Sequence, residues 1–451
     1  MGTQTFAPLF DAAGNLIGFE TSSGRRMFPA ALVGAQSYNP GQVPYTPGSG
    51  GGGSGLPTYL GIVSSRSGVY SGYNPSGPWQ SMSRVRHIAM DSITSLQVVW
   101  GNFAAPASTS VADVAAGTLG QNTWTASIEY PVGTIIPVTF GGANSGSVAG
   151  GGLLVSDPVA VTLPRGTPFY VRCFYNSTWG NLNVANPTLC GVAPAAAGEW
   201  CVNAASGVVD NTKTTVNLTS TSTGLNGQPN AIIGQTKRPT FYLAGDSRMG
   251  WGSSIDPTPN WYGNTGDVPR AIGKQWGIFN AAKSGESYSQ IIASGSPVAG
   301  FARYRIQFAQ YCSHIISGYG INDIVLFSQS AATVLANATA LANYFGKPFF
   351  HETLSPRSSS TDSWATLANQ TTDPTNAVRV AFNDAMRLGY GPPFSGYLEI
   401  ADLTESARDS GLWKVTGSAF GYTPDGLHCN AFGNQSLIEF ANNFSVLPDL
   451  L

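Results

Sequence analysis

Apolar and polar residues alternate with a period of two along most of the chain between about residue 58 and about residue 220. In the segment NTWTASIEY, Trp124, Ala126 and Ile128 point to one side, while the residues between them point to the other, as a half-buried antiparallel strand requires. Similar runs are SLQVVWGNF from Ser95, GTIIPVTF from Gly133 and PFYVRCFY from Pro168. Turn residues separate these strands and no fixed-period repeat is visible, so the pattern predicts a β-sandwich or jelly-roll-like domain.

The pattern changes near Lys237, where short apolar strands begin to alternate with helical stretches. The predicted strands are TFYLAGDS, GIFNAAKSG, HIISGYGIND, KPFFHETLSP and SGYLEIADLT, and the clearest helical stretches are RYRIQFAQYCSHI and ATVLANATALANYFG. This alternation predicts a parallel sheet with helices on both faces. Ligands of such sheets bind at the carboxyl ends of the strands, where each predicted strand runs into a polar or Gly-rich turn.

The N-terminal part of the chain has a different character. Two apolar patches flank turn signals at Gly14 and Gly24, and the sequence PGQVPYTPGSGGGGSGLP that follows is typical of a flexible linker. Because segments of about forty residues rarely fold alone, we expect this head to order against a partner or its own copies. The predicted organisation is therefore an anchor or oligomerisation segment (1–39), a linker (40–57), a β-sandwich-like domain (58–235) and an α/β domain (236–451).

Charged residues make up only 10% of the chain and the formal net charge is -2, against a typical charged share of about 25%. A chain without basic excess is poorly suited to neutralise nucleic-acid phosphates or anionic lipid, so neutral partners such as glycans are favoured. No apolar stretch reaches the roughly 18 residues of a membrane span, and the first residues do not resemble a signal peptide. The five cysteines lack metal-site spacing. Cys190 and Cys201 could be bridged, although a reduced pair is favoured.

Four short motifs lie at the predicted strand ends or near the C-terminus. They are Gly245-Asp246-Ser247, Gly285 within KSGES, Gly320-Ile321-Asn322-Asp323 and Asp425-Gly426-Leu427-His428. In this order they resemble the four blocks of the SGNH/GDSL hydrolase family, over about residues 238–451. The resemblance implies a flavodoxin-like parallel sheet and hydrolysis of esters, most often of acetyl or other short acyl groups. Many members of that family act on O-acetylated carbohydrates.

The residues of these motifs also suggest a mechanism. Ser247 would be the nucleophile and His428 the base that takes its proton, while Asp425, three residues earlier, would hold the His428 ring in the required tautomer. The backbone N–H groups of Ser247 and Gly285 and the side-chain amide of Asn322 would stabilise the oxyanion. Each residue alone could instead be an N-cap, a turn glycine or a packed imidazole. It is the joint occurrence of all five that favours catalysis, and no metal or cofactor is expected.

Three residues near the nucleophile are candidates for contact with substrate. Arg248 could contact a polar or anionic group or simply pair on the surface, and Trp261 and Tyr262 could stack on a sugar ring or belong to the core. Other reactive residue types fit catalysis poorly: His351 begins HETLS, which lacks the second His of a zincin motif, and nothing near Cys429 is placed to activate its thiol. We interpret His87, His314, Asp246 and Asp323 as structural.

The order of segments suggests a setting for this enzyme. A turn-rich anchor, a Gly linker, a β module and a terminal glycan-directed enzyme occur in a similar order in phage tail fibres and tailspikes. We therefore expect a virion-associated esterase that removes O-acyl groups, chiefly acetyl, from a host surface polysaccharide. It would be a homo-oligomer, with a trimer favoured, and residues 1–40 would contact other virion proteins. The alternatives are a secreted or extracellular bacterial carbohydrate or lipid esterase, and a non-catalytic receptor-binding or structural virion protein that retains the fold.

Overall fold

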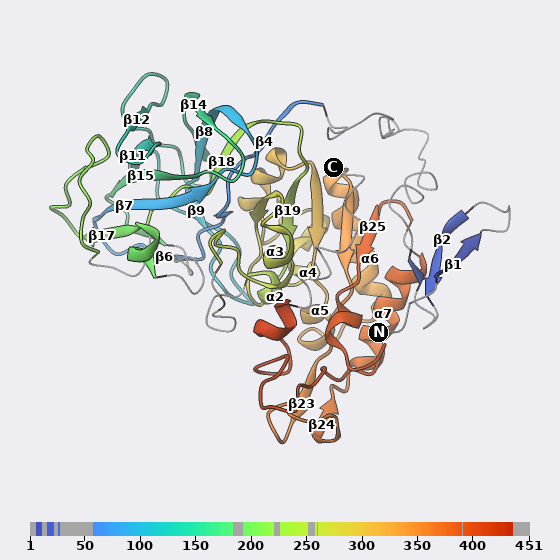
Figure 1. The fold of residues 1–451 in the computed structure, drawn as a ribbon. Helices are drawn as coiled ribbons and strands as arrows, with labels where there is room; N and C mark the ends of the chain where they lie inside the picture. The colour runs from blue at the N-terminus through green and yellow to red at the C-terminus, as the bar shows by residue number, and fades with distance from the viewer. Residues whose placement is uncertain are drawn as a thin grey trace.

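The computed structural model describes residues 6–10, 16–21, 26–27, 57–183, 193–220, 226–250, 258, 260–389 and 391–435. Figure 1 shows a unit of antiparallel sheets, coloured blue to green, beside a unit built around a parallel sheet, coloured yellow to red. A small antiparallel sheet precedes both, with strands β1 (Phe6–Phe10), β2 (Leu16–Thr21) and β3 (Arg26–Met27). The predicted turns at Gly14 and Gly24, and the predicted linker as far as residue 56, lie outside the described residues.

Two five-stranded antiparallel sheets pack around one core in the first unit. The first has the order β12 (Ile135–Val138), β11 (Asn122–Glu129), β15 (Pro168–Ser177), β7 (Trp79–Ile88), β17 (Trp200–Ala204). The second has the order β13 (Leu153–Val155), β8 (Ile93–Gly101), β18 (Ala231–Thr236), β4 (Tyr59–Ile62), with β14 (Val159–Leu163) also paired to β8. Trp100 of β8 lies against Trp124 of β11 in the shared core, 6.4 Å between ring centroids. Short pairs are formed by β6 (Gly72–Asn74) with β16 (Asn181–Asn183) and by β9 (Phe103–Ala104) with β10 (Val114–Ala115).

Strand β11 is buried on both faces, although its alternation predicts burial on one. Trp124, Ala126 and Ile128 face the core as predicted. On the opposite face, Ser127 donates a hydrogen bond to the carbonyl of Thr212 at 2.5 Å. On the same face Glu129 is held by two arginines from neighbouring strands, Arg84 of β7 at 2.8 Å and Arg172 of β15 at 2.7 Å. The polar side of the strand is thus covered by chain that a period-two pattern cannot reveal.

The second unit is built on a six-stranded parallel sheet. Its order is β25 (Gly396–Leu398), β22 (Phe349–Glu352), β21 (His314–Ser317), β19 (Thr240–Ala244), β20 (Gly277–Asn280), β5 (Ser67–Gly68). Apart from β5, the strands follow the flavodoxin-like order 2-1-3-4-5, and each of the five predicted strands is present. Successive residues of β19 face opposite cores: Tyr242 belongs to one cluster, and Phe241 and Leu243 belong to the other. Both faces of the sheet are therefore covered, as expected for parallel strands.

Helices connect these strands, and most of them are short, with α6 and α7 as the longer ones. The α-helices are α2 (Ser247–Gly250), α3 (Asp267–Ile272), α4 (Tyr288–Ile291), α5 (Ile321–Val325), α6 (Ala331–Phe345), α7 (Asn376–Gly389) and α8 (Ala401–Thr404). The 3₁₀ helices are η1 (Pro194–Ala197), η2 (Ala293–Gly295), η3 (Arg305–Tyr311) and η4 (Leu367–Asn369), and a hairpin joins β23 (Ser358–Ser360) to β24 (Gln370–Thr372). Helix α6 corresponds to a predicted helix, the stretch predicted around residues 303–315 forms η3, and α7 was not predicted.

The sheets change from antiparallel to parallel close to the predicted boundary between residues 235 and 236, because β18 ends at Thr236 and β19 begins at Thr240, but the two units do not have separate cores. Ile62 and Phe103 of the antiparallel unit belong to the same buried cluster as Phe279 and Phe308 of the parallel unit. Strand β5 crosses the boundary, because it lies in the first unit by sequence and pairs with β20 of the parallel sheet. The two units therefore share packed interior along their contact.

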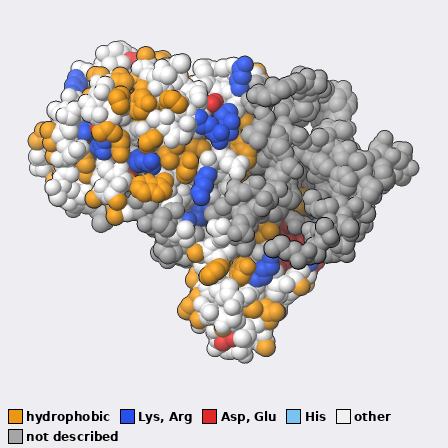
Figure 2. Space-filling view, in the orientation of Figure 1, with side chains coloured by type: hydrophobic (Ala, Val, Ile, Leu, Met, Phe, Trp, Pro, Cys, Tyr) orange, Lys and Arg blue, Asp and Glu red, His pale blue; other side chains and the backbone are white. Residues whose placement is uncertain are grey.

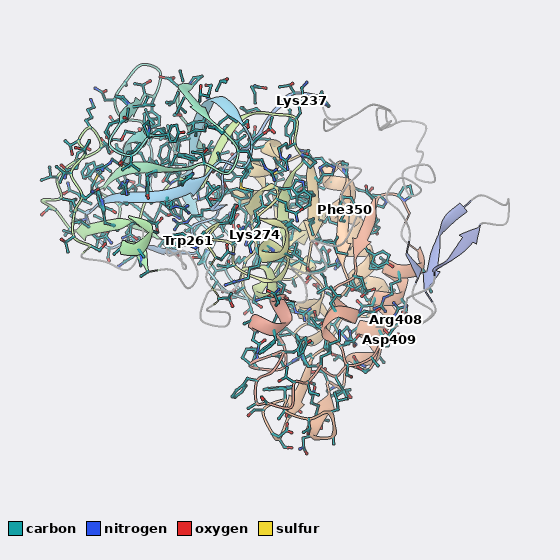
Figure 3. The ribbon with its side chains drawn as sticks, viewed as in Figure 1. Lys237, Trp261, Lys274, Phe350, Arg408 and Asp409 are labelled. Carbon is teal, nitrogen blue, oxygen red and sulfur yellow. The ribbon has the colours of Figure 1, made fainter. Side chains whose placement is uncertain are left out.

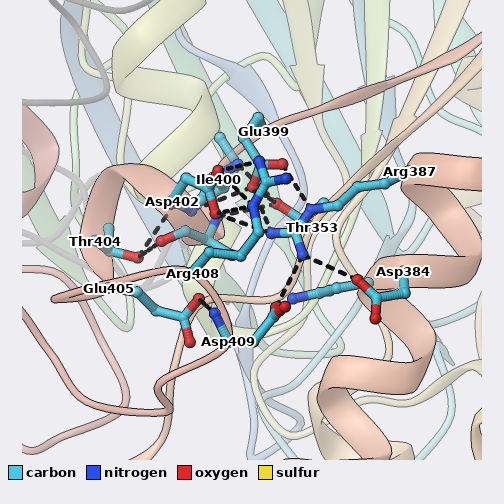
Figure 4. Close-up of polar contacts among 12 residues, drawn as sticks. Thr353, Asp384, Arg387, Glu399, Ile400, Asp402, Thr404, Glu405, Arg408 and Asp409 are labelled. Carbon is cyan, nitrogen blue, oxygen red and sulfur yellow. Dashed lines mark hydrogen bonds and ion pairs between the residues drawn. The ribbon is translucent and has the colours of Figure 1, made fainter. Parts of the chain in front are cut away.

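Several charged side chains form an ion-pair network between α7 and α8 (Figure 4). Arg387 lies at its centre, and its guanidinium is 2.9 Å from Glu399, 3.0 Å from Asp409 and 3.1 Å from Asp402. Figure 3 places Asp409 and the neighbouring Arg408 in the parallel unit, on the side away from the antiparallel sheets. The network fixes the end of α7 to the segment after β25. By contrast, uncharged side chains predominate on the face of the antiparallel unit seen in Figure 2.

We expect Phe279→Ala to lower the free energy of unfolding by about 3–5 kcal/mol, the usual loss for an aromatic ring removed from a packed core. Phe279 is fully buried and stacks on Phe308 with 4.1 Å between ring centroids, beside residues of both units. Urea denaturation followed by circular dichroism measures this loss and should show one cooperative transition. Val132→Ala, at an exposed position, is the control and should change stability by less than about 0.5 kcal/mol. Two separate transitions would contradict a shared core.

Candidate active site

Ser247 stands at the carboxyl end of the central strand of the parallel sheet. Strand β19 ends at Ala244, and α2 begins at Ser247 itself. Gly245 allows this sharp turn, because a Cβ there would lie 2.5 Å from the sulfur of Met249. Asp246 braces the turn by accepting a hydrogen bond from the N–H of Arg248 at 3.0 Å. Ser247 is 8% exposed, so its hydroxyl lies at the edge of the packed interior.

His428 and Asp425 approach Ser247 from a loop 181 residues further along the chain. The Oδ1 atom of Asp425 accepts hydrogen bonds from the backbone N–H groups of Leu427 and His428 at 2.9 and 2.8 Å, which folds the loop into a compact turn. Gly426 is required within it, because its φ is +77° and a Cβ would lie 1.9 Å from the carbonyl oxygen of Ser358. The Oδ2 atom of Asp425 is 2.7 Å from Nδ1 of His428. Nε2 of His428 is 2.8 Å from Oγ of Ser247.

The electrostatics of this chain of hydrogen bonds favour an ionised Asp425. Burial opposes ionisation, but the hydrogen bonds from the His428 ring and backbone outweigh burial and lower the pKa of Asp425 to about 2. A carboxylate at Nδ1 fixes the ring proton on that nitrogen, so that Nε2 carries no proton and can accept the proton of Ser247. The structure thus brings together the three residues that the motifs predicted as nucleophile, base and orienting group.

Gly285 and Asn322 follow the strands on either side of β19. Gly285 comes after β20 with φ +82°, and Asn322 lies in α5 directly after β21. One amide hydrogen of Asn322 is directed to the carbonyl oxygen of Glu286 at 2.8 Å. The same nitrogen is 3.5 Å from Oδ2 of Asp246, which is too long for a strong bond, so its second hydrogen is available to another acceptor.

The candidate substrate contacts have other surroundings. Arg248 is 1% exposed and its guanidinium lies 3.2–3.3 Å from the carbonyl of Leu427. It therefore stiffens the His428 loop from within, and this burial argues against the predicted contact with a substrate. Trp261 is 43% exposed and receives the guanidinium of Arg86 over its ring at 5.1 Å, at the contact between the two units (Figure 3). The N–H of Tyr262 donates to Asn260 at 3.0 Å, and the side chain of Tyr262 is half-buried.

The remaining histidines and Cys429 are buried in the interior. Burial lowers the pKa of His87 to about 3 and those of His314 and His351 to about 4, so these rings are neutral. Burial also raises the pKa of the Cys429 thiol, which keeps it protonated. Among the other thiols, Cys201 is free, while Cys190 lies outside the described residues.

A loop of the antiparallel unit lies beside these residues, and no sequence motif indicated it. The loop from Ser108 to Asp113 reaches across to the parallel unit, where the N–H of Ser108 donates to the carbonyl of Ser284 at 3.2 Å. A Cβ on Gly285 would lie 2.9 Å from Cγ2 of Thr109. Nothing in the spacing of these residues could have predicted the contact, because about 175 residues separate the two segments.

Two kinds of feature are absent from the described parts of the chain. No group of three or more His, Cys, Asp or Glu side chains is arranged to hold a metal ion among those residues. In the same ranges, none of the helices combines the length and the apolar character needed to cross a bilayer.

Solved structures with some similarity to the chain include several esterases. A family two carbohydrate esterase from Clostridium thermocellum, in complex with cellohexaose, is 11% identical; the match covers 87% of this chain and 100% of that one, with TM-score 0.32. Est24, a carbohydrate acetylesterase from Sinorhizobium meliloti, is 14% identical over 47% of this chain and 100% of its own, with TM-score 0.29. A peptidoglycan O-acetylesterase is 10% identical over 85% and 81%, with TM-score 0.35.

Identities and TM-scores this low transfer neither an activity nor a substrate to this chain. No protein-family model matches the sequence, and no curated protein is significantly similar to it. The chemistry proposed below therefore depends on the geometry of the site and on its motifs.

Asp246 should make the stability of the protein depend on pH. Burial raises the pKa of this fully buried carboxyl to about 6, so the folded state holds a proton that the unfolded state has lost between about pH 4 and pH 6. The neutral carboxyl therefore makes its full contribution to the free energy of unfolding below about pH 4, and this contribution is lost as the pH rises through 6. We expect the wild type to lose on the order of 2–3 kcal/mol relative to Asp246→Asn over this interval.

Urea denaturation of both proteins at several values between pH 4 and pH 7 measures this difference. Asp157→Asn is a control of opposite sign, because hydrogen bonds from Thr139, Gly142 and Gly141 lower the pKa of the half-buried Asp157 carboxylate. The contribution of Asp157 to the free energy of unfolding is therefore lost as the pH falls. A stability difference between the wild type and Asp246→Asn that stays constant with pH would show that Asp246 is ionised throughout.

Proposed function

We propose that this protein is a serine esterase that hydrolyses O-acyl groups, chiefly O-acetyl groups, on a carbohydrate. The observation that carries the proposal is the continuous chain of hydrogen bonds from Asp425 through His428 to Ser247 at the carboxyl end of β19. Asn322 and Gly285 follow the two strands next to β19, where donors for an oxyanion are needed. These five residues are also those of the motifs that resemble the SGNH/GDSL hydrolases.

The first half of the reaction transfers the acyl group to the enzyme. Oγ of Ser247 attacks the ester carbonyl carbon while its proton passes to Nε2 of His428, and the carbonyl electron pair moves onto oxygen. The N–H groups of Ser247 and Gly285 and the amide hydrogen of Asn322 that does not bond Glu286 stabilise that oxyanion. When the tetrahedral intermediate collapses, the C–O bond to the sugar breaks. The leaving oxygen takes the proton from His428, so that a free hydroxyl and an acyl-serine result.

The second half restores the enzyme. A water molecule gives a proton to Nε2 of His428 as its oxygen attacks the acyl carbon, and the same donors stabilise the second oxyanion. Collapse breaks the bond to Oγ of Ser247, which recovers the proton from His428, and the carboxylic acid leaves. Asp425 stays ionised throughout and stabilises the imidazolium in both halves.

A carbohydrate substrate is proposed on general grounds. The chain has few charges, and the face of the antiparallel unit in Figure 2 is mainly uncharged, which suits a neutral polymer better than a charged one. The family resemblance of the motifs points to the same class of substrate.

The setting of the enzyme is proposed from the order of its segments alone. A virion-associated tail fibre or spike, trimeric and attached through residues 1–40, remains our prediction, and a secreted or extracellular bacterial carbohydrate or lipid esterase is the alternative. In the virion setting, the polysaccharide on the host surface would be the substrate.

The wild-type protein should release acetate from p-nitrophenyl acetate and from an O-acetylated polysaccharide such as acetylated xylan, and a fluorophosphonate should label Ser247. Ser247→Ala should abolish the labelling and reduce turnover by a factor on the order of 10³ or more, because the nucleophile is lost. Ser289→Ala, a serine in α4, is the matched control. A folded wild-type protein that neither releases acetate nor takes up the label would favour the non-catalytic alternative, a binding or structural protein.

Asn322→Ala should reduce kcat by about 10² to 10³ with little change in KM, because one oxyanion donor is lost and the ground state is bound as before. Steady-state kinetics with p-nitrophenyl acetate give both constants. Asn337→Ala, an amide on α6 that bonds Gln329, should leave both unchanged. If only KM rose and kcat stayed unchanged, Asn322 would be a residue that binds the substrate and not an oxyanion donor.

A further inference from the structure

We infer that Asp113, which the antiparallel unit contributes, is a positioning residue for the reaction and acts on the oxyanion donor Asn322 through Arg305 and Glu286. This inference rests on the proposed esterase function. It assigns the antiparallel unit a part in catalysis that neither the motifs nor the triad geometry suggests.

Glu286 directly follows Gly285 in the chain. Its carbonyl oxygen accepts the hydrogen bond that orients the amide of Asn322, at 2.8 Å. An amide group has two hydrogens, so the bond to Glu286 determines where the second one points. A displacement of Glu286 would therefore move one oxyanion donor, and it would also move Gly285, the adjacent candidate donor.

The side chain of Glu286 is held on several sides within the interior. Tyr319 donates a hydrogen bond to Oε2 at 2.7 Å, Nζ of Lys283 lies 3.6 Å from Oε1, and Arg305 forms an ion pair with Oε2. All four side chains are buried. A buried carboxylate is stable only when such partners are present, so the backbone of Glu286 is fixed by what its side chain binds.

Asp113 completes this cluster from the other unit. Its carboxylate forms an ion pair with the guanidinium of Arg305 and also accepts the backbone N–H groups of Tyr304 and Arg305, at 3.1 and 3.0 Å. Asp113 is itself fully buried. One guanidinium thus joins a carboxylate of the antiparallel unit to the carboxylate of Glu286, and Arg305 cannot turn toward another partner without leaving Asp113 uncompensated.

The same loop also reaches the other side of Gly285. Lys283 donates a hydrogen bond to the carbonyl of Val111, and Gln290 donates one to the carbonyl of Thr109. Thr109 lies directly against Gly285, where a Cβ would approach within 2.9 Å. The loop from Ser108 to Asp113 therefore contacts the segment 283–290 through Ser108, Thr109 and Val111, and Asp113 supplies its buried charge.

The test is the steady-state kinetics of Asp113→Asn with p-nitrophenyl acetate. The neutral amide keeps the size of the side chain but weakens its hold on Arg305, so we expect kcat to fall on the order of 10- to 100-fold with KM nearly unchanged. Glu129→Gln is the matched control, because Glu129 is a buried carboxylate that binds two arginines in the same unit, away from Asn322. It should lose comparable stability and keep the wild-type kcat.

A double-mutant cycle separates positioning from a general loss of structure. If Asp113 acts through Asn322, Asp113→Asn should reduce kcat much less in an Asn322→Ala background than in the wild type. A reduction of equal size in both backgrounds would overturn the inference, as would a folded Asp113→Asn variant with the wild-type kcat.

Should Asp113→Asn fail to fold, Tyr319→Phe decides the question, because it removes a single hydroxyl from Glu286 and leaves the ring in place. A fall in kcat at constant KM supports the inference, and an unchanged kcat refutes it. Failure of the esterase proposal would look different, since the wild type itself would then neither hydrolyse the ester nor react with the fluorophosphonate.

Discussion

The parallel pairing of β19 with both β20 and β21 is the constraint on which the site depends. Parallel strands must end at the same edge of a sheet, so the turns that follow them lie close together. Contacts between the side chains of these turns are not needed to bring them there. Ser247 follows β19, Gly285 follows β20 and Asn322 follows β21. The central position of β19 places Ser247 between the two neighbouring turns. The His428 loop then has only to reach this edge for the set to be complete.

The chain has few charged residues, and many of them lie in its interior. Arg172, Arg248, Arg305 and Arg379 are among the largest fully buried side chains in the described part of the chain. Arg172 is paired with Glu129, Arg305 with Asp113 and Glu286, and Arg379 with Glu405. Ionised groups in the interior require such partners, because desolvation is costly. A chain in which only 10% of residues are charged, and which keeps many of those charges inside, has few left for its surface. This distribution favours neutral partners more strongly than the net charge does.

The sequence predicted the parts of the structure that local patterns encode. Five of the six strands of the parallel sheet were visible as apolar runs that end in polar turns, and the contact between Asp425 and His428 follows from a spacing of three residues in a tight turn. Contacts between distant segments could not be predicted in this way. The pairing of Asp113 with Arg305 spans 192 residues. For Arg248, next to Ser247, the sequence left open a contact with substrate or a surface pair, and it did not indicate burial because charged residues are seldom buried. The structure places Arg248 inside, where the carbonyl of Leu427 accepts its hydrogen bonds.

The shared core bears on what the antiparallel unit does. A carbohydrate-binding module joined to an enzyme by a linker has its own core, and its position relative to the active site varies. Here Ile62 and Phe103 pack in one cluster with Phe279 and Phe308, and β5 extends the parallel sheet. A contact of this kind resembles a protein interior and holds the two units in one arrangement. The loop from Ser108 to Asp113 therefore has a fixed place beside Gly285, and an acyl group bound at Ser247 would lie at a site built by both units. Selection on the antiparallel unit would then act on turnover as well as on binding, because the unit cannot move without moving the donors that it supports.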